Sequence, residues 1–363
     1  MRSTLGSLYR HTLLLFALVP CALLTLALSP ARAHVSTEWG IDRKGGDIPG
    51  KKFVMPNAAE CAKSCNGDAQ CKAYTYVYPG VLGPKGLCFL KDSVPDPIAD
   101  GCCISGVKNG WRSGPYSVKQ ILGDMKIPLD PASTHVCILT RVSGKFQGGG
   151  EKVRVRIGDD DRWWLEVDNH SHQGVAGTAY CFWKGGFIAD GPDRLTSPIF
   201  EAREKHAVPT GNGDAGTFLA GVNGHLRGGG EHARIVQSQQ VFAPSELRVG
   251  SAAGFLKAWA YSFFAGAQQS NQRGTARFFG DEFKLDHVNI VSPRWVEMAR
   301  AQDAMCYFTR LQGRFNGMGE WAEIAPFVDN NHVEHWRLGA QAQGDSEVFA
   351  AARCYLRDQR RTP

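Results

Sequence analysis

The sequence lacks the features that mark several common classes of protein. After Leu28 it has no run that is long and apolar enough to span a bilayer. It contains neither a Gly-x-Ser-x-Gly nucleophile motif nor a His-Glu-x-x-His zinc motif. It also lacks a strong charge of either sign, because 41 Lys and Arg oppose 35 Asp and Glu. These absences argue against a hydrolase of a familiar type and against nucleic acid as the main partner.

The first 33 residues have the pattern of an export signal. Arg2 and Arg10 precede an apolar stretch from Thr12 to Leu28, and Ala31-Arg32-Ala33 resembles a cleavage site. Because Pro20 breaks the stretch, a retained membrane anchor is the weaker interpretation. We expect residues 1–33 to be removed, which takes away three arginines and lowers the formal charge from +6 to +3. The mature chain would then be periplasmic, cell-surface or secreted, with no membrane span.

Ten of the 11 cysteines remain after this cleavage. An even number in an oxidising compartment favours structural disulfides over metal or redox chemistry, and we expect no cofactor and no metal. His170-x-His172 has no ligand partners nearby in the sequence. Asp159-Asp160-Asp161 is interpreted as a charged turn rather than a calcium site.

Residues 34–113 differ from the rest of the chain and hold six cysteines. Asn57 is suited to cap a helix that places Cys61 and Cys65 on one face. An alternating segment at 73–78 and a second at 88–91 are strand candidates. The ordered motifs are Trp39-Gly40-x-Asp42, Cys61-x3-Cys65-x5-Cys71, Ala73-Tyr74-Thr75-Tyr76, Pro79-Gly80, Cys88-x-Leu90-Lys91, Val94-Pro95 and Cys102-Cys103-Ile104-Ser105-Gly106-Val107.

Taken together, these motifs make residues 37–108 resemble a bacterial PAN/apple domain. The resemblance implies an α+β fold with disulfides Cys61–Cys88 and Cys65–Cys71. It also implies a binding module for proteins or carbohydrates, without catalytic residues. Cys102 and Cys103 are left with two interpretations, a vicinal disulfide or separate pairing within the domain.

A glycine-rich string occurs three times in the remaining chain, at about 80 to 90 residue intervals. The copies are Gly144–Glu151, Gly224–Glu231 and Gly313–Glu320, and apolar residues flank each copy at matching positions. The string lacks the lysine and hydroxyl of a nucleotide-binding loop. We interpret it as a strand, a turn that needs glycine dihedrals, and a second strand. Glu151, Glu231 and Glu320 would then accept hydrogen bonds from loop amides, although a shared ligand site is the alternative.

The cysteines follow the same repeat. Cys137 and Cys306 each lie seven residues before their string, and Cys181 and Cys354 end the same copies, so we expect Cys137–Cys181 and Cys306–Cys354. The middle copy has Thr217 and Ser262 at the matching places. It should therefore be the least stable copy in isolation.

We expect three mainly-β repeats, each an antiparallel sandwich or barrel, at 114–190, 191–272 and 273–363. One pseudo-threefold assembly of the repeats is the alternative. Helix-like stretches at 199–205 and 296–302 would join them. We match these repeats to no characterised family.

Tryptophans are the best functional signal in the repeats. Trp163 and Trp164 are adjacent, so on a strand one of them must face away from the core. Flat aromatic faces suit sugar rings and protein hot spots. The sequence therefore predicts an exported, non-enzymatic protein that binds a protein or glycan of the envelope or extracellular space. The alternatives are an envelope assembly factor and, less favoured, a hydrolase of envelope polymers.

Overall fold

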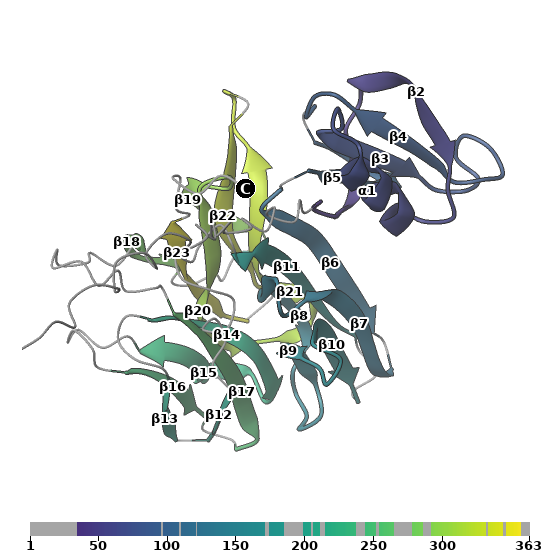
Figure 1. Ribbon diagram of the computed structural model, residues 1–363. Helices are drawn as coiled ribbons and strands as arrows, with labels where there is room; N and C mark the ends of the chain where they lie inside the picture. Colours follow the sequence, from purple (N-terminus) through teal and green to yellow (C-terminus); the bar gives the residue numbers. More distant parts are fainter. Residues whose placement is uncertain are drawn as a thin grey trace, which may run out of the picture. The chain divides into compact units, whose positions relative to one another are not determined.

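The computed structural model describes most of the chain after the predicted signal peptide. It covers residues 35–356 except 96, 109, 121, 171–173, 185–198, 205, 211–214, 237–243, 252–253, 265–277, 286–291, 332 and 344–345. The predicted signal peptide lies outside this part of the chain. In the covered part, 23 strands and one helix are formed (Figure 1). None of the described helical residues forms a segment long and apolar enough to cross a membrane.

The first domain is one helix on a five-stranded antiparallel sheet with strand order β1-β5-β3-β4-β2. Its elements are β1 (Glu38–Asp42), β2 (Asp47–Val54), α1 (Ala58–Gly67), β3 (Ala73–Val77), β4 (Leu87–Lys91) and β5 (Ile98–Val107). The side chain of Asn57 caps α1 as expected, because it accepts a hydrogen bond from the amide of Glu60 at 3.0 Å. All five residues of β3 are buried, since this strand lies inside the sheet and packs against α1.

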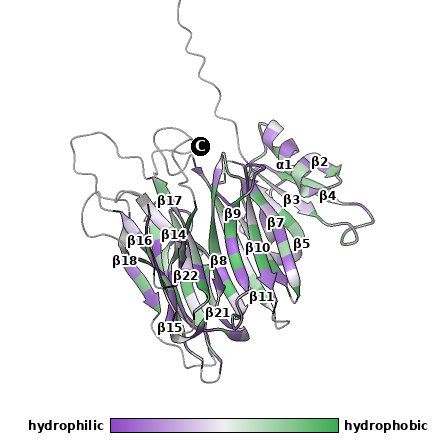
Figure 2. Ribbon diagram, turned by 90° about the horizontal axis from the view of Figure 1, so that it is seen from below, coloured by the Kyte–Doolittle hydropathy of each residue, from purple (hydrophilic) through white to green (hydrophobic). Residues whose placement is uncertain are grey.

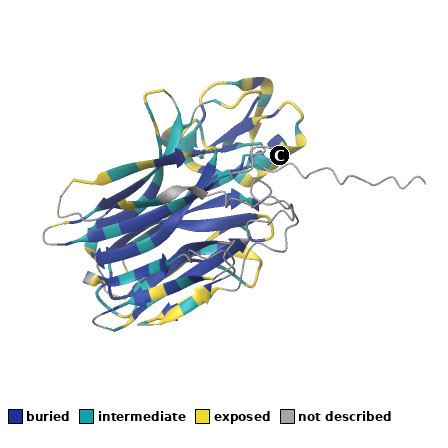
Figure 3. Cartoon of the chain, turned by 90° about the vertical axis from the view of Figure 1, so that its left-hand side faces the viewer, coloured by how far each residue is buried: buried dark blue, intermediate teal, exposed yellow. Residues whose placement is uncertain are grey.

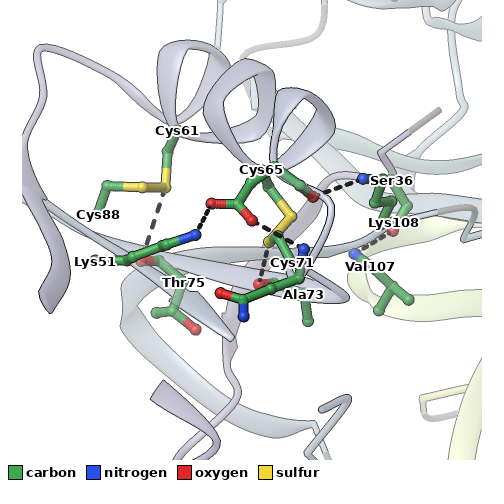
Figure 4. The surroundings of a disulfide bond; sticks show 12 residues. Ser36, Lys51, Cys61, Cys65, Cys71, Ala73, Thr75, Cys88, Val107 and Lys108 are labelled. Atoms are coloured by element: carbon green, nitrogen blue, oxygen red, sulfur yellow. Dashed lines mark hydrogen bonds and ion pairs between the residues drawn. A yellow bond between two sulfur atoms is a disulfide. The ribbon is translucent and has the colours of Figure 1, made fainter. Parts of the chain in front are cut away.

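Disulfides fasten the helix to the sheet and to the loop that follows it. Cys61 bonds Cys88 on β4, and Cys65 bonds Cys71, which agrees with the pairing that the sequence resemblance implies (Figure 4). Both helix cysteines are fully buried. Cys102 and Cys103 form a vicinal disulfide on β5, which resolves the alternative left open by the sequence.

The remaining strands fall into three sets of six, one for each copy of the glycine string. The first repeat has β6 (Arg112–Gln120), β7 (Gly123–Pro131), β8 (His135–Lys145), β9 (Lys152–Ile157), β10 (Arg162–Asn169) and β11 (Val175–Trp183). The second has β12 (Phe200–Arg203), β13 (Ala207–Thr210), β14 (Ala215–Gly224), β15 (Arg227–Val236), β16 (Ser245–Gly250) and β17 (Leu256–Phe264). The third has β18 (Phe278–Leu285), β19 (Arg294–Arg300), β20 (Ala304–Arg314), β21 (Asn316–Val328), β22 (Glu334–Gln341) and β23 (Val348–Leu356).

These strands form three six-stranded sheets, and every sheet takes three strands from each of two repeats. The 1–2 sheet has the order β12-β17-β14-β9-β10-β7, the 2–3 sheet β13-β16-β15-β20-β23-β18, and the 3–1 sheet β19-β22-β21-β8-β11-β6. The expectation of three separate sandwiches or barrels is therefore wrong. Each repeat divides its strands between two sheets, and its two innermost strands pair with neighbouring repeats instead of closing on themselves.

The two stretches expected to be helices are strands. Residues 294–300 form β19, which pairs with β22, and residues 200–203 form β12, which pairs with β17. The edges of the shared sheets supply backbone hydrogen-bond partners at both places, and this tertiary pairing overrides the local helical pattern.

The three glycine strings meet at one point, where backbone hydrogen bonds link the three repeats to one another. Phe146, Leu226 and Phe315 occupy the same position in their copies and are all fully buried. The amide of Phe146 donates to the carbonyl of Phe315 at 2.9 Å, and that of Leu226 to the carbonyl of Phe146 at 2.9 Å. The amide of Phe315 donates to the carbonyl of Leu226 at 2.8 Å, which completes a ring of three bonds. The repeated string is thus the closure of a pseudo-threefold arrangement.

The first glycine of each string makes this closure sterically feasible. Gly144, Gly224 and Gly313 have φ values of 126°, 99° and 122°, a region that side chains strongly disfavour. A Cβ at Gly313 would lie 1.9 Å from the carbonyl oxygen of Glu347. In each copy, the amide of the residue after this glycine donates a hydrogen bond to the carbonyl that an added Cβ would meet.

The core of the repeats is continuous across the three sheets. One cluster of buried apolar side chains draws on strands of all three repeats, and Val142, Val222 and Leu311 are fully buried at equivalent positions. Hydrophobic and hydrophilic bands alternate along many strands, and exposed residues gather in loops and at strand ends (Figures 2 and 3). One face of each sheet therefore packs inward, and the other carries the polar side chains that bear on function.

Candidate functional site

A groove with a volume of about 440 Å³ lies on the polar face of the 3–1 sheet. Strands β6, β11, β8 and β21 form its floor, so two repeats contribute to it. The side chains that line it include Pro115, Ser117, Lys119, Arg141, Ser143, Ala176, Thr178, Tyr180, Met318, Glu323 and Ala325. Most of them alternate along their strands with residues of the core, which is the period of two expected for a sheet with one buried face.

One cross-strand row crosses this groove. Ser117 pairs with Thr178, Thr178 with Arg141, and Arg141 with Glu323. The row continues through Gly339 to Trp295 on β19. Because adjacent strands lie ~4.8 Å apart, the row presents hydroxyl, cationic, anionic and aromatic groups in succession.

The groove offers paired and unpaired polar groups. The hydroxyls of Ser117 and Thr178 are 2.9 Å apart, and Arg141 Nη1 donates to Glu323 Oε2 at 2.8 Å. Among the described residues, the buried hydroxyl of Ser143 has no hydrogen-bond partner. A buried hydroxyl without a partner has lost its hydration at a free-energy cost.

Aromatic rings and guanidinium groups continue the surface beside the groove. The Arg141 guanidinium lies 5.1 Å from the centre of the Trp321 ring, and the Trp321 and Trp295 rings are 5.3 Å apart. The Arg337 guanidinium lies 3.9 Å from the centre of the Trp295 ring. The Trp321 indole N–H donates to Gln341 at 2.8 Å, which fixes the ring in place. Stacked cations and rings of this kind form a preorganised surface.

The 1–2 sheet differs from the 3–1 sheet at the position of Thr178. The position of Thr178, opposite Arg141, is occupied in the second repeat by Trp259, opposite Gly221. Trp259 is only 6% exposed, its indole N–H donates to Glu201 at 3.1 Å, and Arg154 lies 4.9 Å from its ring centre. The large ring fills the space that the small Thr178 side chain leaves open.

The sequence-predicted tryptophans divide between the two faces of β10, as their adjacency requires. Trp163 is fully buried, and its indole N–H donates to the carbonyl of His135 at 2.8 Å, so the prediction that it contacts a ligand is wrong. Trp164 is half-buried, with its N–H bonded to Asp160 at 2.9 Å and the Lys126 ammonium 4.9 Å from its ring centre. A binding role for Trp164 stays a prediction.

The motif glutamates lie at the closure rather than in an open site. Glu151, Glu231 and Glu320 are 1%, 5% and 4% exposed. Glu151 accepts a hydrogen bond from the amide of Gly148 at 2.8 Å, as the structural interpretation expects. Burial raises the pKa of Glu320, and hydrogen bonds from the Ser346 hydroxyl and from backbone amides oppose this rise. Such enclosure favours a structural role over the alternative of a shared ligand site.

The structure describes only one histidine of the His170-x-His172 pair. His172 lies outside the described residues, and His170 lies 3.5 Å from Asp168. Asp124, Asp168 and His170 bring ligand atoms within 4.8 Å of one another. Burial and a hydrogen bond with Asp124 raise the pKa of Asp168, while the Lys152 ammonium 3.5 Å away supplies a positive charge to the cluster. Lys152 thus partly fills the electrostatic role that a bound cation would have.

The residues that build the groove were missed by sequence reasoning. The repeat alignment does contain one signal, because Thr178 and Trp259 directly precede the matching strings Ala179-Tyr180-Cys181 and Ala260-Tyr261-Ser262. Glu323, which lies beside Arg141 on β21, follows it by 182 residues in the sequence. Only the sheet topology brings those two side chains together.

Comparison with known families identifies one part of the chain. Residues 41–91 match the PAN domain, which confirms the resemblance drawn from the sequence and indicates a module for binding protein or carbohydrate. The three-sheet region lies outside this match. No curated protein matches the chain.

Proposed function

We propose that this chain is an exported, non-catalytic binding protein that holds a glycan in the groove of the 3–1 sheet. The PAN domain would supply a second contact with an envelope or extracellular partner. The observation that carries the proposal is the row Ser117, Thr178, Arg141 and Glu323 beside Trp321. A sugar presents hydroxyls on its edges and C–H groups on its faces, and this row offers donors, acceptors and an adjacent aromatic surface.

The charge pattern supports a neutral or weakly charged glycan at this position. Arg141 and Glu323 form one ion pair, so the row across the groove is balanced. Both side chains retain hydrogen-bonding atoms beyond their mutual contact, and they can bind adjacent sugar hydroxyls. Export is supported by the five disulfides, which form and persist in oxidising compartments.

The test is a glycan-array screen of the oxidised mature protein, followed by titration calorimetry of the hits. The variant Thr178→Trp places in the groove the side chain that the second repeat has at the equivalent position. We expect it to weaken binding at least tenfold, while leaving the thermal unfolding transition unchanged. The matched control is Trp259→Thr, the reciprocal exchange on the 1–2 sheet, which should leave the dissociation constant within twofold.

Other outcomes would replace the proposal. A protein from envelope extract that binds with no glycan hit would favour adhesion or assembly. Release of products from an envelope polymer would contradict the non-catalytic assignment. A glycan hit that Thr178→Trp leaves unaffected would place recognition elsewhere, with Trp164 and the PAN domain as the next candidates.

A further inference from the structure

The 2–3 sheet carries an unusual row of positive charges on the face equivalent to the groove. Lys284 on β18 pairs with Ala351, and Ala351 pairs with Arg310 on β20. Arg310 pairs with Arg234 on β15, and Arg234 with Arg248 on β16. Four cations therefore lie in one cross-strand row, and three of them occupy adjacent strands.

The equivalent rows of the other two sheets are electrically balanced. In the 3–1 sheet the corresponding row contains one cation and one anion, Arg141 and Glu323. The row of the 1–2 sheet alternates in sign, and reads Glu201, Trp259, Gly221, Arg154, Glu166 and Lys126. The equivalent rows of the other two sheets are balanced, so the fold itself does not require a positive row. The positive row is specific to the 2–3 sheet.

Nearby acids compensate only the ends of the positive row. Glu246 lies 2.5 Å from Arg248, and Glu282 lies 3.7 Å from Lys284. Arg310 donates to the neutral side chain of Gln312. Arg234, at the middle, forms no ion pair with any described residue, and its buried Nε has no hydrogen-bond partner among them.

This arrangement is costly without a counter-charge. Like charges directly opposite each other on neighbouring strands destabilise a sheet, and a buried donor without a partner adds a desolvation penalty. A phosphate, sulfate or carboxylate group between Arg310 and Arg234 would offset the repulsion between their guanidinium groups. Arginine is the side chain best suited to such groups, because its planar guanidinium binds two of their oxygens at once.

We propose that this row, Lys284, Arg310, Arg234 and Arg248, binds the repeated anionic groups of an acidic polysaccharide. The site is separate from the groove and extends beyond the function proposed above. Three adjacent strands place the arginines ~5 Å apart, so a chain with regularly spaced anions can contact several of them. Phe349 supplies an apolar surface for a sugar ring, since its ring centre lies 5.9 Å from the Arg310 guanidinium. The disulfides favour an extracellular polyanion over an intracellular one.

The experiment measures binding of the oxidised mature protein to dextran sulfate, with neutral dextran of the same length as the comparison. We expect binding to dextran sulfate alone, with an affinity that falls as salt rises. Arg234→Ala and Arg310→Ala should each weaken it at least tenfold at low salt. Arg203→Ala removes an exposed arginine of the 1–2 sheet that is paired with Glu201, and should change the affinity less than twofold.

Further arms separate this site from the groove and from other polyanions. Thr178→Trp should leave binding of dextran sulfate unchanged, so failure of the groove proposal would not affect this result. Thermal unfolding of each variant checks that the fold is retained. Equal losses for Arg203→Ala and Arg234→Ala, or no binding by the wild type, would overturn the site. Tighter binding of single-stranded DNA, with the same loss for Arg234→Ala, would overturn the assignment to a polysaccharide.

Discussion

Thr217 and Ser262 face each other across β14 and β17 with their hydroxyl oxygens 2.9 Å apart. Both are fully buried, and they pair in register at the position where Cys137 pairs with Cys181 and Cys306 with Cys354. A hydrogen bond therefore replaces a disulfide in the second repeat, as the sequence alignment of the three copies suggests. The backbone places the two positions close together with or without the covalent bond.

The variant Thr217→Cys/Ser262→Cys should form a third disulfide of the same kind. The bond would close a loop with a sequence separation of 45 residues. In the chain-entropy model such a loop stabilises the oxidised protein by up to about 4 kcal/mol. Urea unfolding of the oxidised and reduced variant measures the effect. The reverse exchange, Cys137→Thr/Cys181→Ser, should destabilise the oxidised protein, and no change in either variant would contradict the expectation.

An isolated second repeat, residues 191–272, should not fold. The sequence predicted that this repeat would be the least stable because it lacks a disulfide, but the sheets give a stronger reason. β14 needs β9 of the first repeat, and β15 needs β20 of the third. Removal of both partners exposes two strand edges and the shared core. Far-UV circular dichroism and amide NMR dispersion test this, and a well-dispersed spectrum would show that the repeat is an independent domain.

The sequence predicted local features better than the way the strands are paired. The Asn57 cap and the opposite faces of Trp163 and Trp164 follow from short-range patterns. The two disulfides within repeats follow from comparison of the repeat copies. Alternation of apolar and polar residues shows which face of a strand is buried, but not which strand lies beside it. The pairing of β8 with β21 therefore could not be read from the sequence. The groove depends on that pairing, because Glu323 reaches Arg141 only through it.

The same limit explains why the arginine row was missed. Arg234, Arg248 and Arg310 each lie between two buried residues of their strand, as expected for positions that face away from the core. Their alignment in one row appears only when the register of β16, β15 and β20 is known. Weak net charge thus conceals a local concentration of positive charge.

Gly144→Ala should weaken the closure of the sheets. Gly144 has φ of 126°, and an added Cβ would lie 2.5 Å from the carbonyl oxygen of Gly174. Forcing alanine into this conformation costs about 1–3 kcal/mol before the clash is counted. Urea unfolding measures the loss. The control is Gly149→Ala in the same loop, where a Cβ would meet no atom within 4 Å, so the variant should unfold like the wild type.

Glu320→Gln should change how stability depends on pH. Burial raises the pKa of Glu320 in the folded protein, so the folded state holds this proton to a higher pH than the unfolded state does. In the window between the two pKa values the folded state binds more protons, and the free energy of unfolding falls as pH rises. The stabilising contribution of the protonated group is complete below the unfolded pKa, which is about 4.3, and is lost as pH rises through the folded value.

Glutamine retains an acceptor for the Gly317 amide and the Ser346 hydroxyl without the buried charge. Glu320→Gln should therefore resemble the wild type below pH 4 and be more stable than it at pH 8. Urea unfolding at both values, with the free energies compared at each pH, measures the difference. A variant that is less stable at pH 8 would mean that amide hydrogen bonds to the carboxylate outweigh its desolvation. Glu320 would then stabilise the folded protein in its ionised form, which would contradict a folded-state pKa above the ordinary value.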